Sequence, residues 1–252
     1  MADPVLEARG LTRRFGGLSA CDGVAIALKR GELHALLGPN GAGKSTLINL
    51  LSGDLKPTSG SILFKGTELA GMSPDRRSRL GIGRSYQKTN IFPAFTVLEN
   101  ARLAAQSREP RPFAILSDAA RDPAALVRAT RGLELAGLNE HVERQAGALS
   151  HGEQRQLEIA MVLATDPEVL LLDEPLAGMG PEESMRMVGL LKSLAGAHAI
   201  LLVEHDMDAV FALADVITVM VNGQVLESGP PAQIRASANV QRAYLGHEDE
   251  HG

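Results

Sequence analysis

A glycine-rich segment near the start of the chain constrains its fold more than any other feature. Residues 38–46 read GPNGAGKST and match the pattern G-x-x-x-x-G-K-[ST]. An apolar run at 33–37 precedes this segment, and a helical pattern begins near Lys44. In that setting the glycines let successive backbone N–H groups converge on one anion, and the start of the helix adds partial positive charge. The segment therefore predicts a phosphate-binding loop between a strand and a helix, as found in α/β folds.

The loop also predicts individual contacts to a nucleotide. Lys44 is expected to reach the β- and γ-phosphates, and the Ser45 hydroxyl is expected to ligate Mg²⁺. The remaining contacts are expected from the backbone and small side chains of Gly38, Asn40, Gly41, Gly43 and Thr46. The alternative is a glycine-rich turn with no ligand. We favour nucleotide binding because the pattern has both the preceding strand and the following helix that it requires.

A second segment supplies the rest of a hydrolytic site. The apolar run 169–172 ends in two carboxylates, Asp173 and Glu174. Because the carboxyl ends of parallel strands share one edge of a sheet, this pair is expected beside the phosphate loop. There Asp173 would hold the metal through water, and Glu174 would polarise an attacking water. A strand-end salt bridge is the alternative for the pair, and a small-molecule kinase is the alternative for the phosphate loop alone.

Apolar patterns divide the chain into an αβ body, a helical middle and a tail. Apolar runs without polar alternation predict strands covered on both faces of a mostly parallel sheet, at 33–37, 169–172, 199–203 and 216–221. The first 30 residues favour antiparallel strands, and Asn222-Gly223 predicts a hairpin into a strand at 224–228. Helices are expected at 96–106, 123–136, 151–164, 181–195, 206–213 and 231–237.

These patterns predict a single domain of 252 residues with two parts. The αβ body comprises about 1–87 and 166–246, with a mostly parallel sheet and an antiparallel β-region at its start. A helical subdomain comprises about 88–165 and contains an irregular, proline-rich insertion near 107–122. The acidic residues 247–252 are expected to form a flexible tail.

Composition excludes several kinds of protein. Lys and Arg total 25 against 30 Asp and Glu, so the net charge of −5 gives no overall basic field for nucleic acid. The single cysteine, Cys21, excludes an intramolecular disulfide and fits a reducing compartment. The first ten residues include Asp3, Glu7 and Arg9, where a secretory signal needs an apolar core. The apolar runs are too short to span a bilayer.

A further segment, LSHGEQ, opens the helix predicted at 151–164. Ser150 and Glu153 form an ordinary capping box by sequence, and that explanation suffices for the segment alone. Gly152 would also let an anion approach the positive end of the helix.

With this segment, the chain resembles the ATP-binding subunits of ABC transporters over nearly its whole length. In that family a phosphate loop, a glutamine, an LSGGQ-type signature, a strand ending in Asp-Glu and a histidine occur in this order. The counterparts here are Lys44, Gln87, residues 150–154, Asp173 with Glu174, and His205.

The resemblance implies roles that the residues alone do not establish. Gln87 would bring its amide oxygen to Mg²⁺, and His205 would donate a hydrogen bond to the γ-phosphate. Phe15 would stack on the adenine, and Ser150 and Gly152 would contact the ATP held by a second subunit. Taken alone, Gln87 is a surface glutamine, His205 a turn residue and Phe15 a packed side chain.

The chain departs from the family pattern in two places. His151 and Glu153 stand where the signature usually has glycine and glutamine, although Ser150 and Gly152 are kept. Gly180 stands where the family's dimer-contact loop commonly ends in aspartate. We expect altered contacts around the signature and leave open how two ATP sites communicate.

The segments GGLSACDGV, EPLAGMGPEE and LVEHDMDAV look most similar to the ATPase subunits of branched-chain amino acid importers. That resemblance implies ATP and Mg²⁺, a second ATP-binding subunit, integral-membrane permease subunits and, indirectly, an external substrate-binding protein. It places the chain in the cytoplasm, peripheral on the inner face of the cell membrane. Urea, amides or lipopolysaccharide are alternative cargoes. A soluble, non-transport ABC ATPase is the alternative class, although a DNA-repair member would need a long coiled coil, and heptads are absent.

Overall fold

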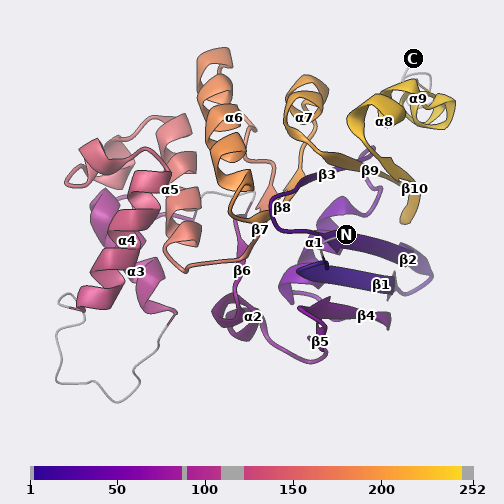
Figure 1. Cartoon of the computed structure of the whole chain (residues 1–252), viewed down its shortest axis with the longest axis horizontal. Helices are drawn as coiled ribbons and strands as arrows, with labels where there is room; N and C mark the ends of the chain where they lie inside the picture. Colours follow the sequence, from indigo (N-terminus) through magenta and orange to yellow (C-terminus); the bar gives the residue numbers. More distant parts are fainter. Residues whose placement is uncertain (1–2, 87–89, 109–121, 246–252) are drawn as a thin grey trace.

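The computed structural model describes residues 3–86, 90–108 and 122–245 (Figure 1). Gln87, most of the predicted insertion and the predicted tail lie outside the described residues.

A six-stranded sheet runs through the described residues in the order β10-β9-β3-β8-β7-β6. Its strands are β3 (Leu33–Leu37), β6 (Ile82–Arg84), β7 (Val169–Asp173), β8 (Ala199–Val203), β9 (Val216–Val221) and β10 (Gln224–Gly229). β3, β6, β7, β8 and β9 pair in parallel, and β9 turns into the antiparallel β10 at Asn222-Gly223. The four apolar runs predicted as parallel strands and the predicted hairpin are therefore confirmed.

A second, antiparallel sheet has the order β2-β1-β4-β5. It consists of β1 (Leu6–Phe15), β2 (Leu18–Leu28), β4 (Ser59–Phe64) and β5 (Thr67–Glu68). The antiparallel start of the chain is confirmed by the pairing of β1 with β2. β4 was not predicted. It pairs with β1, although the phosphate loop and the following helix lie between the two strands in the sequence.

Helix α1 (Lys44–Ser52) packs in the core between the two sheets, and its apolar face includes Leu47 and Leu51. Alternate residues of the buried strands face opposite layers because side chains alternate along a strand. In β7, Val169 and Leu171 join the cluster around α1, whereas Leu170 and Leu172 join the cluster on the other face. Both faces are thus covered, which explains the unbroken apolar runs in the sequence.

The helices that cover the other face are α5 (His151–Leu163), α6 (Pro181–Ala195) and α7 (Met207–Leu213). Helices α3 (Val97–Gln106) and α4 (Pro123–Leu135) pack with α5 around a separate apolar cluster. Figure 1 shows these three helices to one side of the six-stranded sheet. Helix α5 belongs to both clusters and so joins the helical part to the sheet. The exact boundaries of the two parts stay a prediction.

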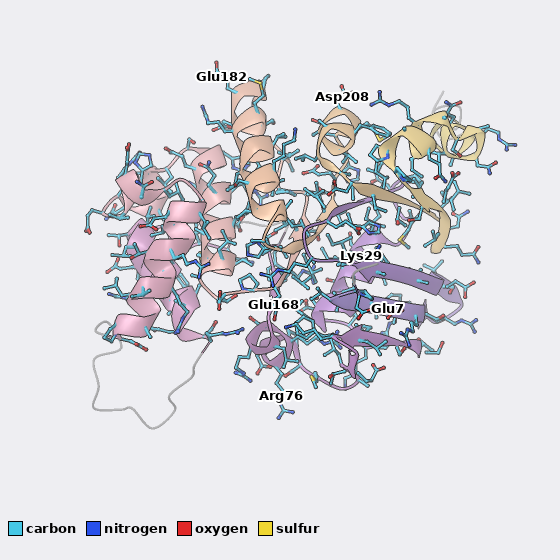
Figure 2. All side chains as sticks on the ribbon, viewed as in Figure 1. Glu7, Lys29, Arg76, Glu168, Glu182 and Asp208 are labelled. Atoms are coloured by element: carbon cyan, nitrogen blue, oxygen red, sulfur yellow. The ribbon has the colours of Figure 1, made fainter. Side chains whose placement is uncertain are left out.

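The remaining helices of the described residues are short. They are α2 (Pro74–Leu80), α8 (Pro231–Ala236), α9 (Ala238–Leu245) and the 3-10 helices Asn139–His141 and Ala146–Ala148. Charged side chains such as Arg76, Glu182 and Asp208 point outward from α2, α6 and α7 (Figure 2). Within the part of the chain that the structure describes, no helix has both the length and the apolar character needed to cross a membrane.

Candidate active site

The phosphate-loop segment lies between β3 and α1, as its sequence requires. Gly43 begins α1 with a φ of 102°, and a Cβ built there would lie 2.3 Å from the backbone oxygen of Ala20. At Gly38 a Cβ would lie 2.2 Å from the backbone oxygen of Met220. Both positions therefore exclude a side chain, because the loop backbone packs directly against the backbones of β2 and β9.

Lys44 is buried at the start of α1. Its Nζ donates to the backbone oxygens of Gly38, at 2.5 Å, and Pro39, at 3.1 Å. Burial lowers the pKa of Lys44, and the nearby carboxylates of Glu174 and Asp173 oppose this effect. The amine is therefore held along the loop, within the electrostatic reach of the predicted catalytic Glu174 and of the predicted metal ligand Asp173.

An open cleft of about 610 Å³ lies in front of the loop. This volume falls within the usual range for small-molecule sites. The predicted site residues that line it are Phe15, Asn40, Gly41, Gly43, Lys44, Ser45, Thr46, Glu174 and His205. Phe15 is 44% exposed as a whole residue, and the Arg13 guanidinium lies over its ring, 4.5 Å from the centroid. The structure thus brings Phe15 and the phosphate loop, from the start of the chain, together with Glu174 and His205, which are more than 120 residues further on.

Glu174 and His205 form a hydrogen-bonded pair in this cleft. Glu174 follows β7 and His205 follows β8, and their Oε1 and Nε2 atoms lie 2.5 Å apart. The backbone of Glu174 has a φ of 51°, and its N–H donates to the oxygen of Val203 at 2.9 Å. A non-glycine residue in this region costs about 1–3 kcal/mol, and such strain concentrates at functional sites.

Glu204 supports this pair and was missed by the sequence prediction. Its buried carboxylate accepts hydrogen bonds from the N–H of Leu176, at 2.7 Å, and of His205, at 3.1 Å. Burial raises the pKa of Glu204, and the two N–H groups counteract that rise. The sequence could have indicated Glu204, because this carboxylate directly follows an apolar run, as Asp173 does.

Asp173 lies at the end of β7, where it is buried. Burial raises its pKa, and the Arg84 guanidinium, 3.6 Å from Oδ2, acts in the opposite direction. Mg²⁺ prefers oxygen ligands and commonly uses one or two protein groups together with substrate phosphates. The Asp173 carboxylate and the Ser45 hydroxyl are such donors. No cluster of three or more His, Cys, Asp or Glu side chains suited to a metal occurs among the described residues.

The signature residues lie elsewhere, at the start of α5. Ser150 caps the helix in a capping box with Glu153, as predicted. The Ser150 hydroxyl donates to Glu183 Oε1 at 3.1 Å, and the Gly152 N–H donates to the same oxygen at 3.2 Å. His151 Nε2 lies 3.2 Å from the backbone oxygen of Ala177. Ser150 and Gly152 are therefore not brought to the cleft of their own chain, and Glu183, on α6, is a contact that the sequence prediction missed.

The predicted hairpin contacts the phosphate loop, which its sequence did not indicate. The Gly223 N–H donates to the Ala42 oxygen at 3.0 Å, and the Gly223 oxygen accepts from the N–H of Asp22 at 2.8 Å. Asn222 joins Leu18, Ser19 and Ala20 in lining the cleft. The turn thus braces the loop from the side of the β9–β10 hairpin.

Comparisons with known proteins agree with these features. A family model described as ABC transporter matches residues 21–177, and one described as branched-chain amino acid ATP-binding cassette transporter matches residues 224–250. The chain is 42% identical to the high-affinity branched-chain amino acid transport ATP-binding protein LivG of Salmonella typhimurium, covering 98% of this chain and 99% of LivG.

Identity to the corresponding protein BraF of Pseudomonas aeruginosa is 40%, with coverage of 98% and 99%. Among solved structures, an ATP-binding cassette of an ABC transporter in its ADP conformation superposes with a TM-score of 0.85. It is 29% identical and covers 96% of this chain and 99% of that one.

Proposed function

Because the chain belongs to the ABC transporter ATP-binding family, we propose that it is the ATP-hydrolysing subunit of an importer for branched-chain amino acids. The observation that carries hydrolysis is the cleft that unites Lys44 with the Glu174–His205 pair. The proposal of cargo comes from the similarity to LivG and BraF along nearly the whole chain.

ATP would lie in the cleft with its phosphates on the loop. The backbone N–H groups around Gly41 and Gly43 and the Lys44 ammonium would bind the β- and γ-phosphates. Adenine would stack on the exposed face of Phe15, because aromatic rings pair well with a flat base.

Ser45 and Asp173 would hold Mg²⁺, with Gln87 as a further ligand. When bound, the ion neutralises charge on the phosphates as hydrolysis proceeds. The carboxylate of Asp173 and the hydroxyl of Ser45 are oxygen donors that fit this hard cation, whereas soft thiolate donors would not.

Glu174 would accept a hydrogen bond from the attacking water and polarise it towards the γ-phosphate. The backbone N–H of His205 is held by Glu204 and its Nε2 by Glu174; when ATP is bound, Nε2 would leave Glu174 and donate to the same phosphate.

The signature residues would complete the ATP site of a second, homologous or identical subunit. Ser150 and Gly152 lie at the N-terminus of α5, where backbone N–H groups and the helix dipole favour an anion. Closure and reopening of the pair would move integral-membrane permease subunits, fed by an external binding protein. The chain would thus act in the cytoplasm on the inner face of the cell membrane.

Uptake measurements in cells of the source organism test this function. The cells carry either the wild-type chain or Glu174→Gln. The uptake of labelled leucine, isoleucine and valine is measured, and so are the uptake of urea, the uptake of a short amide and the export of lipopolysaccharide. We expect loss of branched-chain amino acid uptake with the variant. Loss confined to another cargo would overturn the assignment, and unchanged transport of every cargo would favour a non-transport ATPase.

A further inference from the structure

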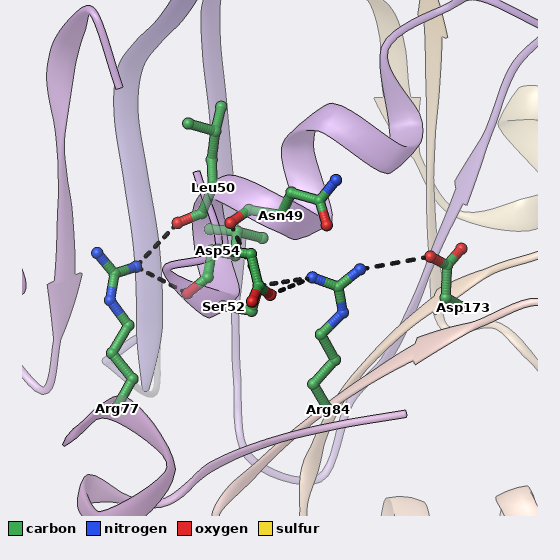
Figure 3. A network of polar contacts seen from close by, with 8 residues as sticks. Asn49, Leu50, Ser52, Asp54, Arg77, Arg84 and Asp173 are labelled. Carbon is green, nitrogen blue, oxygen red and sulfur yellow. Dashed lines mark hydrogen bonds and ion pairs between the residues drawn. The ribbon is translucent and has the colours of Figure 1, made fainter. Parts of the chain in front are cut away.

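Arg84 joins three parts of the described structure that no sequence motif connects. It ends β6, and its side chain is 9% exposed. Its Nη1 donates to Ser52 Oγ at 2.7 Å and to Asp54 Oδ2 at 2.6 Å. Its Nη2 lies 3.6 Å from Asp173 Oδ2. Figure 3 shows the guanidinium lying between the end of α1 on one side and Asp173 on the other.

The position of α1 gives these contacts a consequence for the active site. Ser45 lies in the first turn of α1, and Ser52 is its last residue, with Asp54 close behind. A hydrogen-bonded helix of this length moves as one body, so a restraint on its end also restrains its start. Asp173 is the last residue of β7, the parallel neighbour of β6. One guanidinium therefore links the elements that carry the Ser45 hydroxyl and the Asp173 carboxylate.

We propose that Arg84 is a positioning residue for the magnesium site, because it fixes the Asp173 carboxylate relative to helix α1. This inference rests on the proposed function, which assigns Mg²⁺ to Ser45 and Asp173. The planar guanidinium presents several N–H groups in a rigid fork. One side of it is fixed by the hydrogen bonds to Ser52 and Asp54, and the other side attracts the Asp173 carboxylate as an ion pair. Contact through Oδ2 leaves the other carboxylate oxygen of Asp173 free of Arg84. Partners behind a metal ligand commonly set the affinity for the metal.

Arg77 provides a matched comparison within the same network. It is also buried, and its Nη1 donates to the backbone oxygens of Leu50, at 2.8 Å, and Leu51, at 2.9 Å. Both arginines therefore stabilise the C-terminal end of α1, where cations are favourable. Figure 3 shows Arg77 on the side of that helix end away from Asp173. A purely structural role for Arg84 would make the two arginines equivalent.

The test measures how much Mg²⁺ strengthens ATP binding to the full chain. Calorimetry gives the dissociation constant of ATP in EDTA and in Mg²⁺, and their ratio is the magnesium-linked gain. We expect Arg84→Gln to reduce this gain by about tenfold or more, while the constant in EDTA changes little. Arg77→Gln should lower the melting temperature but keep the gain. An unchanged gain in folded Arg84→Gln, or an equal loss in Arg77→Gln, would overturn the inference.

Two further proteins keep the test decisive. Arg84→Lys preserves the charge but not the fork, so it is the variant to use if Arg84→Gln does not fold. We expect it to lose part of the gain, and an unchanged gain would count against positioning. The wild type and Asp173→Asn test the magnesium site itself. If the wild type shows no magnesium-linked gain, the proposed function is refuted, and Arg84 then has no metal site to position. Asp173→Asn is expected to lose the gain because it removes the proposed ligand.

Discussion

At the scale of single residues, Glu174 is constrained by both its backbone and its side chain. Its left-handed backbone and its hydrogen bond to His205 direct the carboxylate into the cleft. Gln has nearly the same shape but lacks the negative charge that polarises water. We expect Glu174→Gln to bind ATP normally and to hydrolyse it at least about a hundredfold more slowly. Phosphate release and ATP calorimetry on the same preparation provide the measurement, and near-normal hydrolysis would remove Glu174 from this role.

A substitution of Lys44 should weaken ATP binding itself, whereas the substitution of Glu174 should slow only hydrolysis. Its ammonium lies along the phosphate loop, and a hydrogen bond from a charged donor contributes about 1.5–3 kcal/mol. We therefore expect Lys44→Ala to raise the dissociation constant of ATP by on the order of ten- to a hundredfold. Since the ammonium also braces the loop carbonyls, a thermal melt of the variant is the control for local unfolding. ATP affinity equal to that of the wild type would contradict the assignment of the loop.

Cys21 reports on the integrity of the same region. The thiol is fully buried, its Sγ lies 3.7 Å from the backbone oxygen of Gly43, and burial raises its pKa from 9.0 to about 11. Thiolate is the reactive form. At pH 8 we therefore expect iodoacetamide to label the folded protein far more slowly than the urea-unfolded protein, as followed by mass spectrometry. Fast labelling of the folded chain would show that the packing around the loop is looser than described.

The same raised pKa fixes the sign of a pH effect on stability. An exposed thiol ionises near pH 9, whereas the folded one ionises only near 11. Unfolding therefore releases a proton above pH 9, and the contribution of Cys21 to stability, complete below that pH, is lost as the pH rises towards 11. Comparing melts of the wild type and Cys21→Ala across this window isolates the effect from other groups.

At the scale of elements, two helices begin with the same device. Thr96 caps α3 and Ser150 caps α5, each in a capping box with a glutamate three residues on. Removing either hydroxyl should lower the free energy of unfolding by about 1 kcal/mol. Only Ser150→Ala should also reduce ATP turnover, since Ser150 is the proposed contact to a second subunit's ATP. Denaturant unfolding and hydrolysis assays on both variants check this, and equal turnover would leave Ser150 as a cap alone.

The elements also show how far the sequence determines the fold. The buried parallel strands and the β9–β10 hairpin were predictable because their signals are local, namely apolar runs and Asn222-Gly223. β4 was not, because it becomes a strand by pairing with β1, which is distant in the sequence. The site divides in the same way. Lys44 and Glu174 belong to local patterns, whereas Arg84 and Glu183 acquire their importance from contacts made across the fold. Glu204 lies between these cases, because it directly follows an apolar strand but owes its role to the contact with Leu176.

At the scale of the whole molecule, the chain carries two halves of an ATP site in different places. The cleft contains Lys44, Glu174 and His205, whereas Ser150 and Gly152 lie at the start of α5 and point to Glu183. One chain therefore does not complete the proposed site by itself. Two chains that face each other, with the cleft of one against α5 of the other, would complete two sites at once.

Glu183 should oppose that association. Its carboxylate accepts hydrogen bonds from the Ser150 hydroxyl and the Gly152 N–H, the donors proposed for the partner's phosphate. The hydrogen bond from Ser150 lowers the pKa of Glu183, so the group keeps its negative charge near neutral pH. An anion already on these donors must leave before a phosphate can take its place, and the two negative charges also repel each other.

We therefore expect Glu183→Ala to promote ATP-dependent dimer formation. Glu182→Ala is the matched control, because this adjacent glutamate is exposed on the same turn of α6 and its removal changes the net charge equally. Sedimentation velocity with ATP and Mg²⁺, in a Glu174→Gln background that prevents hydrolysis, gives the protomer concentration at half-association. Freeing the donors should lower it by on the order of tenfold. If Glu183→Ala instead associates like Glu182→Ala, the Glu183 carboxylate does not affect the association of the two chains. If it associates more weakly, the carboxylate helps to hold the chains together. Either result contradicts competition with the phosphate.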